Sequence, residues 1–159
     1  MAQREVRVNG NETTDSNGVP LTPFRNVYSG LARTLTAEDN GALCLFSTAA
    51  GYTYTLPAAQ PGLFFEFQVT TTITSVAAKT ICAAGDFLLG HYVQSTDGTF
   101  TNAYRAANGS TILAISMNGT TTGGYIGDYY RVVAISDTQW AIWGIGQATG
   151  TEATPFATS

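Results

Sequence analysis

His91 is the only histidine in this chain of 159 residues, and a serine or cysteine hydrolase would need it as its base. It lies in the run FLLGHYV, among apolar neighbours and directly after a glycine. We therefore expect a strand histidine without a catalytic role. A zinc site takes three or four converging His, Cys or carboxylate ligands, and the chain has one histidine and two cysteines. We expect neither a metal nor a cofactor.

The carboxylates that could act as a catalytic pair on glycosidic bonds are Glu66, Asp86, Asp128 and Asp137. Asp86 and Asp137 adjoin turn residues, where a short acidic side chain accepts hydrogen bonds from local backbone amides. The segment GIGQATG (144–150) is similar to a glycine-rich phosphate loop, but its third glycine is one position late and no strand–helix unit surrounds it. We interpret it as flexible chain leading into the C-terminal tail, and we expect no enzymatic activity.

The two cysteines lie in apolar runs, Cys44 in ALCLF and Cys82 in TICAAG. Neither has a CxxC or paired-histidine spacing around it. We expect both to be buried free thiols, and a disulfide is the alternative.

Two tryptophans near the C-terminus could contact a ligand or a partner. Trp140 and Trp143 are three positions apart, so they face opposite sides of a strand. With Tyr129 and Tyr130 nearby, one of them could stack on a sugar or on a partner protein. Core packing is expected for at least one of the two.

The chain is poor in charge. Hydrophobic residues make up 44% of it, but charged residues make up only 11%, against about 25% in an average protein. Such a neutral surface suits a protein that is packed against partners, although a merely threonine-rich β-protein is the alternative. The net charge of −4 argues against nucleic acid as a partner. With no signal peptide and no apolar run of membrane-spanning length, we expect a soluble protein made without secretion.

From residue 31 onward, short β-branched and aromatic runs alternate with turn signals, at a spacing typical of all-β sandwiches and barrels. We expect an all-β fold whose body is an antiparallel β-sandwich or jelly-roll-like. A single helical turn is expected at residues 36–40, with Thr36 as its cap and Gly41 as its exit. The predicted strands are residues 42–47, 52–56, 64–69, 79–83, 87–94, 100–105, 111–117, 129–135 and 139–145.

Within these strands the two-residue alternation of β-structure predicts which side chains are buried. The predicted buried positions are Tyr52, Tyr54, Leu56, Phe65, Phe67 and Val69. Pro57 ends one strand, and AAQPG turns the chain into the next. Pairs of turn residues lie between the later strands and predict a succession of antiparallel hairpins. These pairs are Asp97-Gly98, Asn108-Gly109 and Asn118-Gly119.

The first residues differ from the rest, because residues 9–23 carry two Asn-Gly steps, two prolines and almost no large apolar side chain. We expect residues 1–23 to form an extended N-terminal arm, residues 24–150 the sandwich body and residues 151–159 a C-terminal tail. Arginines of the arm would pair with acidic groups of a partner, its prolines lower the entropy lost on docking, and its apolar side chains would enter grooves. The predicted partner-binding residues are Arg4, Arg7, Pro20, Leu21, Pro23 and Phe24.

Four segments of the chain resemble small structural proteins of tailed bacteriophages, most closely the capsid decoration, or cement, proteins. They are LTAEDNGALCLFSTAAGYTYTLPAAQPGLFFEF (35–67), NGTTTGGYIGDYY (118–130) and the C-terminal WAIWG and GTEATPFATS. The resemblance implies an all-β homotrimer on the outer capsid surface of the virion, made in the host cytoplasm. Such a protein staples neighbouring capsomers. Its partners would be the phage major capsid protein and copies of itself, without nucleic acid or membrane, and no catalytic or cofactor residues are implied.

The pattern G-x-x-x-x-L-P-x-x-x-x-G-x-x-F-x-F in the first segment also resembles parts of phage tail and fibre proteins. The alternative function is therefore a receptor- or glycan-binding β-module of a tail fibre. A ring of exposed aromatic side chains without a clamping arm would favour this alternative. An arm buried against a neighbour would favour decoration.

Overall fold

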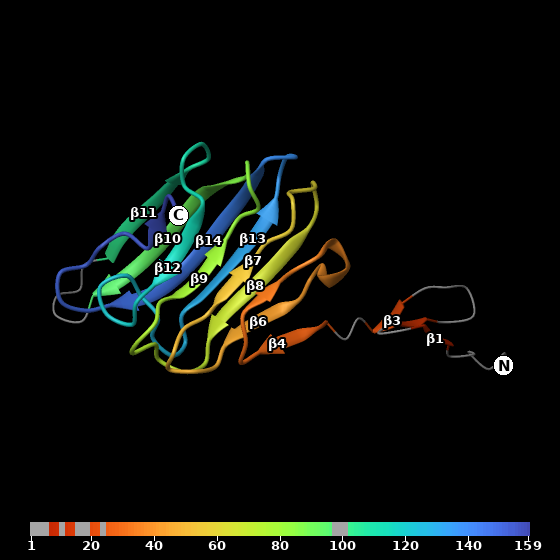
Figure 1. The fold of residues 1–159 in the computed structure, drawn as a ribbon, viewed down its shortest axis with the longest axis horizontal. Coiled ribbons are helices and arrows are strands. Elements are labelled where there is room, and N and C mark those ends of the chain that lie inside the picture. Colours follow the sequence, from red (N-terminus) through yellow and green to blue (C-terminus); the bar gives the residue numbers. More distant parts are fainter. Residues whose placement is uncertain (1–6, 10–11, 15–19, 23–24, 97–101) are drawn as a thin grey trace.

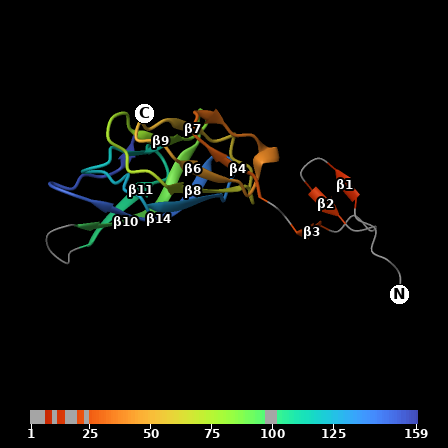
Figure 2. The same ribbon diagram turned by 90° about the horizontal axis from the view of Figure 1, so that it is seen from below.

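The computed structural model describes residues 7–9, 12–14, 20–22, 25–96 and 102–159. Their main part consists of two β-sheets packed face to face (Figures 1 and 2). In order across the larger sheet, the strands are β11 (Asn102–Asn108), β10 (Phe87–Thr96), β14 (Gln139–Ala148), β13 (Tyr129–Ala134), β8 (Phe64–Val69), β6 (Leu43–Phe46) and β4 (Val27–Ser29). Those of the smaller sheet are β15 (Phe156–Ala157), β12 (Ala114–Met117), β9 (Ala78–Ile81), β7 (Thr53–Thr55) and β5 (Arg33–Thr34). The predicted all-β sandwich is confirmed.

Both sheets are mixed, which the turn signals did not predict. β10 pairs antiparallel with β11 but parallel with β14, and β6 lies parallel to both β4 and β8. Gly109 and Gly119 have the positive φ angles, 73° and 78°, that tight turns require. Each of these turns leads into the other sheet, so the predicted succession of hairpins is wrong there. Asp97-Gly98 lies outside the described residues.

From β4 to β9 the chain places successive strands alternately in the larger and the smaller sheet. As a result, β4, β6 and β8 are parallel neighbours in one sheet, while β5, β7 and β9 are parallel neighbours in the other. Each pair of successive strands therefore adds one strand to each side of the core, and Figure 2 shows the two resulting layers.

The core between the sheets is rich in aromatic side chains. Phe67 is fully buried, stacks on Tyr130 with 4.9 Å between ring centroids and meets Tyr54 edge-on at 5.7 Å. The alternation predicted for β8 is confirmed, because every second residue of this strand is buried and the others are partly exposed. Core contacts of this kind fix the register, since a slip of one residue would turn the phenylalanines towards solvent.

The cysteine prediction is confirmed, because Cys44 and Cys82 are both buried free thiols. Burial raises the pKa of each thiol to about 12. The reactive thiolate is therefore scarce near neutral pH, and both residues act as small apolar side chains of the core.

The predicted helical turn is present as a short 3-10 helix, η1 (Ala37–Asp39). Thr36 precedes it, and the carboxylate of Asp39 accepts hydrogen bonds from the Thr36 backbone N–H at 2.9 Å and from the Thr36 hydroxyl at 3.1 Å. Gly41 follows with a φ of 81°, as expected for the exit. This turn connects β5 to β6 and so carries the chain from the smaller to the larger sheet.

Two expectations about the C-terminal part need correction. Residues 151–159 are not a free tail, because β15 pairs with β12 and Phe156 is buried in the core. The segment GIGQATG is not a flexible lead, because most of it belongs to β14. A Cβ at Gly146 would lie 1.8 Å from the hydroxyl oxygen of Tyr92. Glycine is therefore required there by close packing and not by mobility.

The described parts of the segment 1–23 form a small antiparallel sheet of their own. It consists of β1 (Arg7–Asn9), β2 (Glu12–Thr14) and β3 (Pro20–Thr22), with β2 paired to both others. These strands pair with no strand of the sandwich, and they lie apart from it in both views (Figures 1 and 2). The segment expected as an extended arm thus contains local β-structure.

Candidate binding surface

The outward side of the larger sheet carries a group of exposed apolar side chains. We call outer face the outward positions of β11, β10, β14, β13 and β8. Four large hydrophobic residues on it are exposed: Tyr104 by 74%, Ile145 by 59%, Trp143 by 54% and Leu89 by 36%. Isolated exposed apolar residues are common on proteins, but contiguous ones mark interaction sites. The strand register shows that these residues are contiguous.

One row of side chains crosses four neighbouring strands without interruption. Val93 of β10 lies opposite Tyr104 of β11 on one side and opposite Ile145 of β14 on the other. Ile145 in turn lies opposite Tyr129 of β13. Directly opposite side chains of a sheet are in contact distance, at about 4.5–5.5 Å between Cβ atoms. The row is therefore a continuous apolar strip, about four strands wide.

Trp143 lies at the centre of the next row. Its neighbours are His91 on β10 and Arg131 on β13, and Arg131 in turn lies opposite Glu66 on β8. A third row is again apolar, with Leu89, Ala141, Val133 and Phe64 following one another across the strands. The charged side chains at the outward positions of these five strands therefore lie in one narrow band between two mainly apolar rows, which end at the polar residues Gln68 and Asn108.

The negative charge within this band is compensated by residues of the same chain. One carboxylate oxygen of Glu66 forms an ion pair with Arg25. The other accepts a hydrogen bond from the Tyr129 hydroxyl at 2.6 Å. The guanidinium of Arg131 lies over the ring of Phe64, 4.5 Å from its centroid. Glu66 is the only acidic residue at the outward positions of these five strands, so the face carries no uncompensated negative charge.

The tryptophan prediction is confirmed, because Trp140 is fully buried while Trp143 is on the outer face. His91 lies in a strand as expected, exposed beside Trp143. Sequence reasoning missed Tyr104, Ile145 and Leu89. The signal for Ile145 was present in QWAIWGIGQA, where large apolar residues occur on both sides of the alternation. A strand with one face towards water normally has polar residues on that side.

The buried acidic residues serve local structure. Asp128 accepts hydrogen bonds from the backbone N–H groups of Gly124 at 2.7 Å and Gln147 at 2.9 Å, and from the Tyr92 hydroxyl at 3.4 Å. Burial raises the pKa of Asp128, and these hydrogen bonds oppose that rise. Asp86 accepts from the backbone N–H of Ala59 at 2.7 Å, a distant segment and not the local amide that was expected.

These carboxylates therefore hold loops against strands. Within the described part of the chain, no group of three or more His, Cys, Asp or Glu side chains could hold a metal ion. No helix in that part is long and apolar enough to cross a membrane. The predicted absence of a cofactor stays a prediction.

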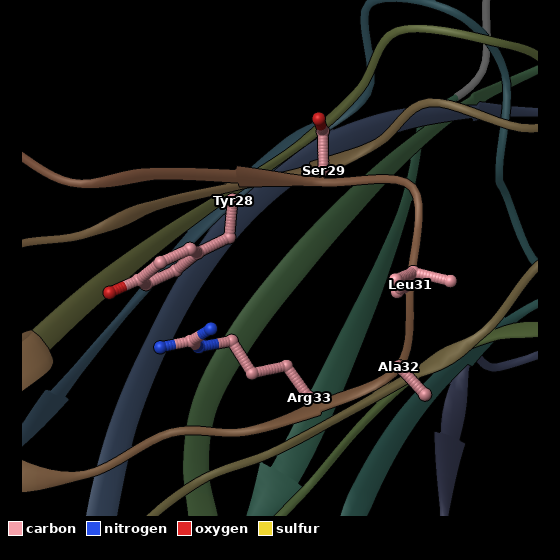
Figure 3. Close-up of a pocket in the computed structure, with 5 residues that line it drawn as sticks. All are labelled: Tyr28, Ser29, Leu31, Ala32 and Arg33. Atoms are coloured by element: carbon pink, nitrogen blue, oxygen red, sulfur yellow. The ribbon is translucent and has the colours of Figure 1, made fainter.

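A small hollow lies at the turn between β4 and β5 (Figure 3). The guanidinium of Arg33 lies over the ring of Tyr28, 3.7 Å from its centroid, and 3.5 Å from an Asp39 carboxylate oxygen. Leu31, 78% exposed, forms part of the rim. The hollow has a volume of about 170 Å³, below the range of about 300–1,000 Å³ usual for ligand pockets. It is a structural feature of the turn and a poor candidate site.

The predicted arm residues are only partly covered by the structure. Arg4, Pro23 and Phe24 lie outside the described residues. Arg7 belongs to β1, and Pro20 and Leu21 belong to β3. Their role in binding stays a prediction. Comparison of the chain with protein-family models, with curated proteins and with solved structures finds no match.

Proposed function

We propose that this chain is a capsid decoration (cement) protein of a tailed bacteriophage, which binds the outer capsid surface and stabilises contacts between capsomers. The observation that carries the proposal is the outer face, a broad and mainly apolar surface on which the carboxylate of Glu66 is paired within the chain. Such a surface is suited to lasting contact with protein, because it gives up little hydration of charged groups when it is covered. The sequence resemblance to decoration proteins is the reason why we propose the capsid as the surface that is bound.

In this proposal the sandwich and the N-terminal segment have separate tasks. The sandwich is a rigid body of two sheets, which can carry load between neighbouring capsomers without changing shape. The arm contacts the major capsid protein, through residues that we assign to a clamp: Arg4, Arg7, Pro20, Leu21, Pro23 and Phe24. The protein acts as a closed symmetric oligomer. No chemical step is part of this function.

The proposal is tested on purified phage particles. A decoration protein is present in a fixed ratio to the major capsid protein and is removed without opening the shell. We expect quantitative mass spectrometry to find hundreds of copies per particle, an order of magnitude set by the capsid lattice and not by a tail. Stripped shells should bind the purified chain saturably and should then withstand higher temperature, because a ligand that binds the intact shell stabilises it. A few copies per particle, confined to tails, would contradict the proposal.

The alternative is a receptor- or glycan-binding module of a tail fibre. Two exposed aromatic rings of the outer face, Trp143 and Tyr104, favour it, since sugars stack on such rings. Titration with a panel of bacterial surface oligosaccharides, followed by tryptophan fluorescence, separates the two functions. A saturable change that Trp143→Ala abolishes would support the fibre module.

A further inference from the structure

We propose that the outer face is where two copies of this chain pack against each other, as a two-fold pair with β10 and β14 at its centre. The inference goes beyond the proposed function, because it names a partner and a surface and does not depend on a capsid. Its basis is the continuous apolar strip on β11, β10, β14 and β13, together with the internally paired carboxylate of Glu66 beside it.

The composition of the strip favours protein over sugar as the occupant. A sugar ring stacks on aromatic side chains and needs polar groups for its hydroxyls. On either side of Trp143, however, the outer face carries exposed aliphatic side chains, of which Ile145 is 59% and Leu89 is 36% exposed. Branched aliphatic side chains gain most when they are packed against other apolar groups and removed from water. Protein therefore covers this surface better than a glycan.

The charge distribution favours a second copy over an unrelated acidic or basic partner. The chain carries a net charge of −4, so two copies repel each other unless they meet where negative charge is absent. The outer face meets this condition, because its only carboxylate, Glu66, is paired with Arg25 and Tyr129 of the same chain. In a two-fold contact a patch packs against the same patch of the second copy, so its own charges must not repel each other. A nearly neutral apolar patch meets this requirement.

The size of the face lies at the lower end of the range for standard interfaces. The five strands from β11 to β8 span about 20 Å at roughly 4.8 Å between neighbours, and strands of the length of β10 and β14 extend over about 33 Å. The projected area is thus about 600 Å² and larger along the side-chain relief, which approaches the roughly 800 Å² that each partner contributes to a stable complex. A contact of one patch with the same patch has two-fold symmetry.

The central experiment compares two isoleucines with the same substitution. Ile145→Asp places a charge in the middle of the strip, whereas Ile126→Asp changes a residue of similar exposure, 68%, in the loop before β13. One chain has a mass of 16.8 kDa. Light scattering of the full chain should give twice this mass for the wild type and for Ile126→Asp. For Ile145→Asp we expect the dissociation constant to rise about tenfold or more. Thermal melting at low protein concentration shows that both variants are folded.

A second measurement reports on the face itself. Trp140 is fully buried within one chain, so its emission stays constant, while Trp143 becomes hydrated when the pair separates. Dilution of the wild type should therefore shift the fluorescence to longer wavelength, and Trp143→Phe should remove this shift while the mass still falls on dilution. Equal dissociation constants for Ile145→Asp and Ile126→Asp, or emission that is insensitive to dilution, would overturn the inference.

The failure of the inference can be told apart from the failure of the proposed function. A wild-type chain that remains monomeric at about 100 µM, far above the dissociation constants of specific pairs, would contradict the proposed two-fold contact. If Ile145→Asp then also lost binding to stripped shells, the outer face would contact the capsid, and decoration would stand. A mass of three chains would overturn the two-fold pair in favour of the trimer that the resemblance implies.

Discussion

Trp140 and Trp143 lie three positions apart on β14 and are on opposite faces of the larger sheet. Trp140 is fully buried between the sheets, with its ring centroid 5.8 Å from that of Phe65. Trp143 is 54% exposed on the outer face. One strand therefore contributes both a central side chain of the core and the centre of the candidate binding surface.

This relationship predicts opposite outcomes for two matched substitutions. Trp140→Ala should lower the free energy of unfolding by about 3–5 kcal/mol, because it leaves a large cavity in the core. Trp143→Ala should change the free energy of unfolding of the single chain by about 0.5 kcal/mol or less, because its ring has few contacts to lose. Urea denaturation at low protein concentration measures both. Similar losses for the two variants would contradict the assignment of the faces.

The core position of Phe67 gives a second prediction. Phe67→Ala should lower the free energy of unfolding by about 3–5 kcal/mol, since the ring stacks on Tyr130 and is fully buried. Phe64→Ala is the matched control on the same strand, and about 1 kcal/mol is expected because its ring lies on the outer face under Arg131. A loss below about 1 kcal/mol for Phe67→Ala would mean that the register of β8 is wrong.

The glycine at position 146 gives a third prediction. A Cβ there would lie 1.8 Å from the Tyr92 hydroxyl oxygen and 2.6 Å from an Asp128 carboxylate oxygen. Gly146→Ala should therefore destabilise the chain by about 3 kcal/mol or more through overpacking. In the background of Tyr92→Phe, which lacks that oxygen, the same substitution should cost about 1 kcal/mol less. Additive effects in this double-mutant cycle would contradict the close packing of the two residues.

Asp39 predicts a specific contribution to acid sensitivity. Burial alone would raise the pKa of this carboxyl, but hydrogen bonds from Tyr28 and Thr36 and the charge of Arg33 outweigh burial and lower the pKa. Because the pKa is lowered in the folded state, ionised Asp39 stabilises the fold at pH values above the ordinary carboxyl pKa of about 4. This stabilisation is lost as the pH falls through the folded-state pKa. Between about pH 6 and pH 3, Asp39→Asn should lose less of its unfolding free energy than the wild type. If the unfolding free energies of the two proteins fell equally over this pH range, Asp39 would make no specific contribution to acid sensitivity.

The separate small sheet β1–β3 predicts that the N-terminal segment and the sandwich are independent. Deleting residues 1–23 should leave the melting temperature nearly unchanged, because β1–β3 pair with no strand of the sandwich. Binding to stripped shells should weaken tenfold or more, about 1.4 kcal/mol, because the clamp is lost. Equal binding by the truncated chain would refute the clamp. Failure of that chain to fold would place the segment within the body.

Strand positions could be predicted because periodicity is local, and this is why the boundaries of β8 were predicted without error. The strands β5 and β15 were missed, since two residues are too few to show any alternation. The parallel pairing of β10 with β14 was also missed, because it joins segments about fifty residues apart and no local signal records it. Turn residues such as Asn118-Gly119 fix a backbone angle but not which sheet the chain enters next.

The outer face was only partly predictable for a related reason. The spacing of Trp140 and Trp143 placed them on opposite sides of one strand. However, the neighbours of Trp143, such as Tyr104 and Val93, come from strands whose order in the sheet the sequence does not reveal. The residues of a surface patch depend on which strands are neighbours in the sheet, whereas the alternation of buried and exposed residues can be predicted from one strand alone.

The alternating course of the chain from β4 to β9 has a mechanical consequence. Every connection in this region runs from one sheet to the other, so the two layers are tied together covalently at several points along their length. A force that pulls the layers apart is therefore shared by these connections and by the core together, and the sheets cannot slide past each other as two independent plates could. Unfolding such a body by force requires whole strands to separate from their neighbours in the sheet, so that many hydrogen bonds must break at once.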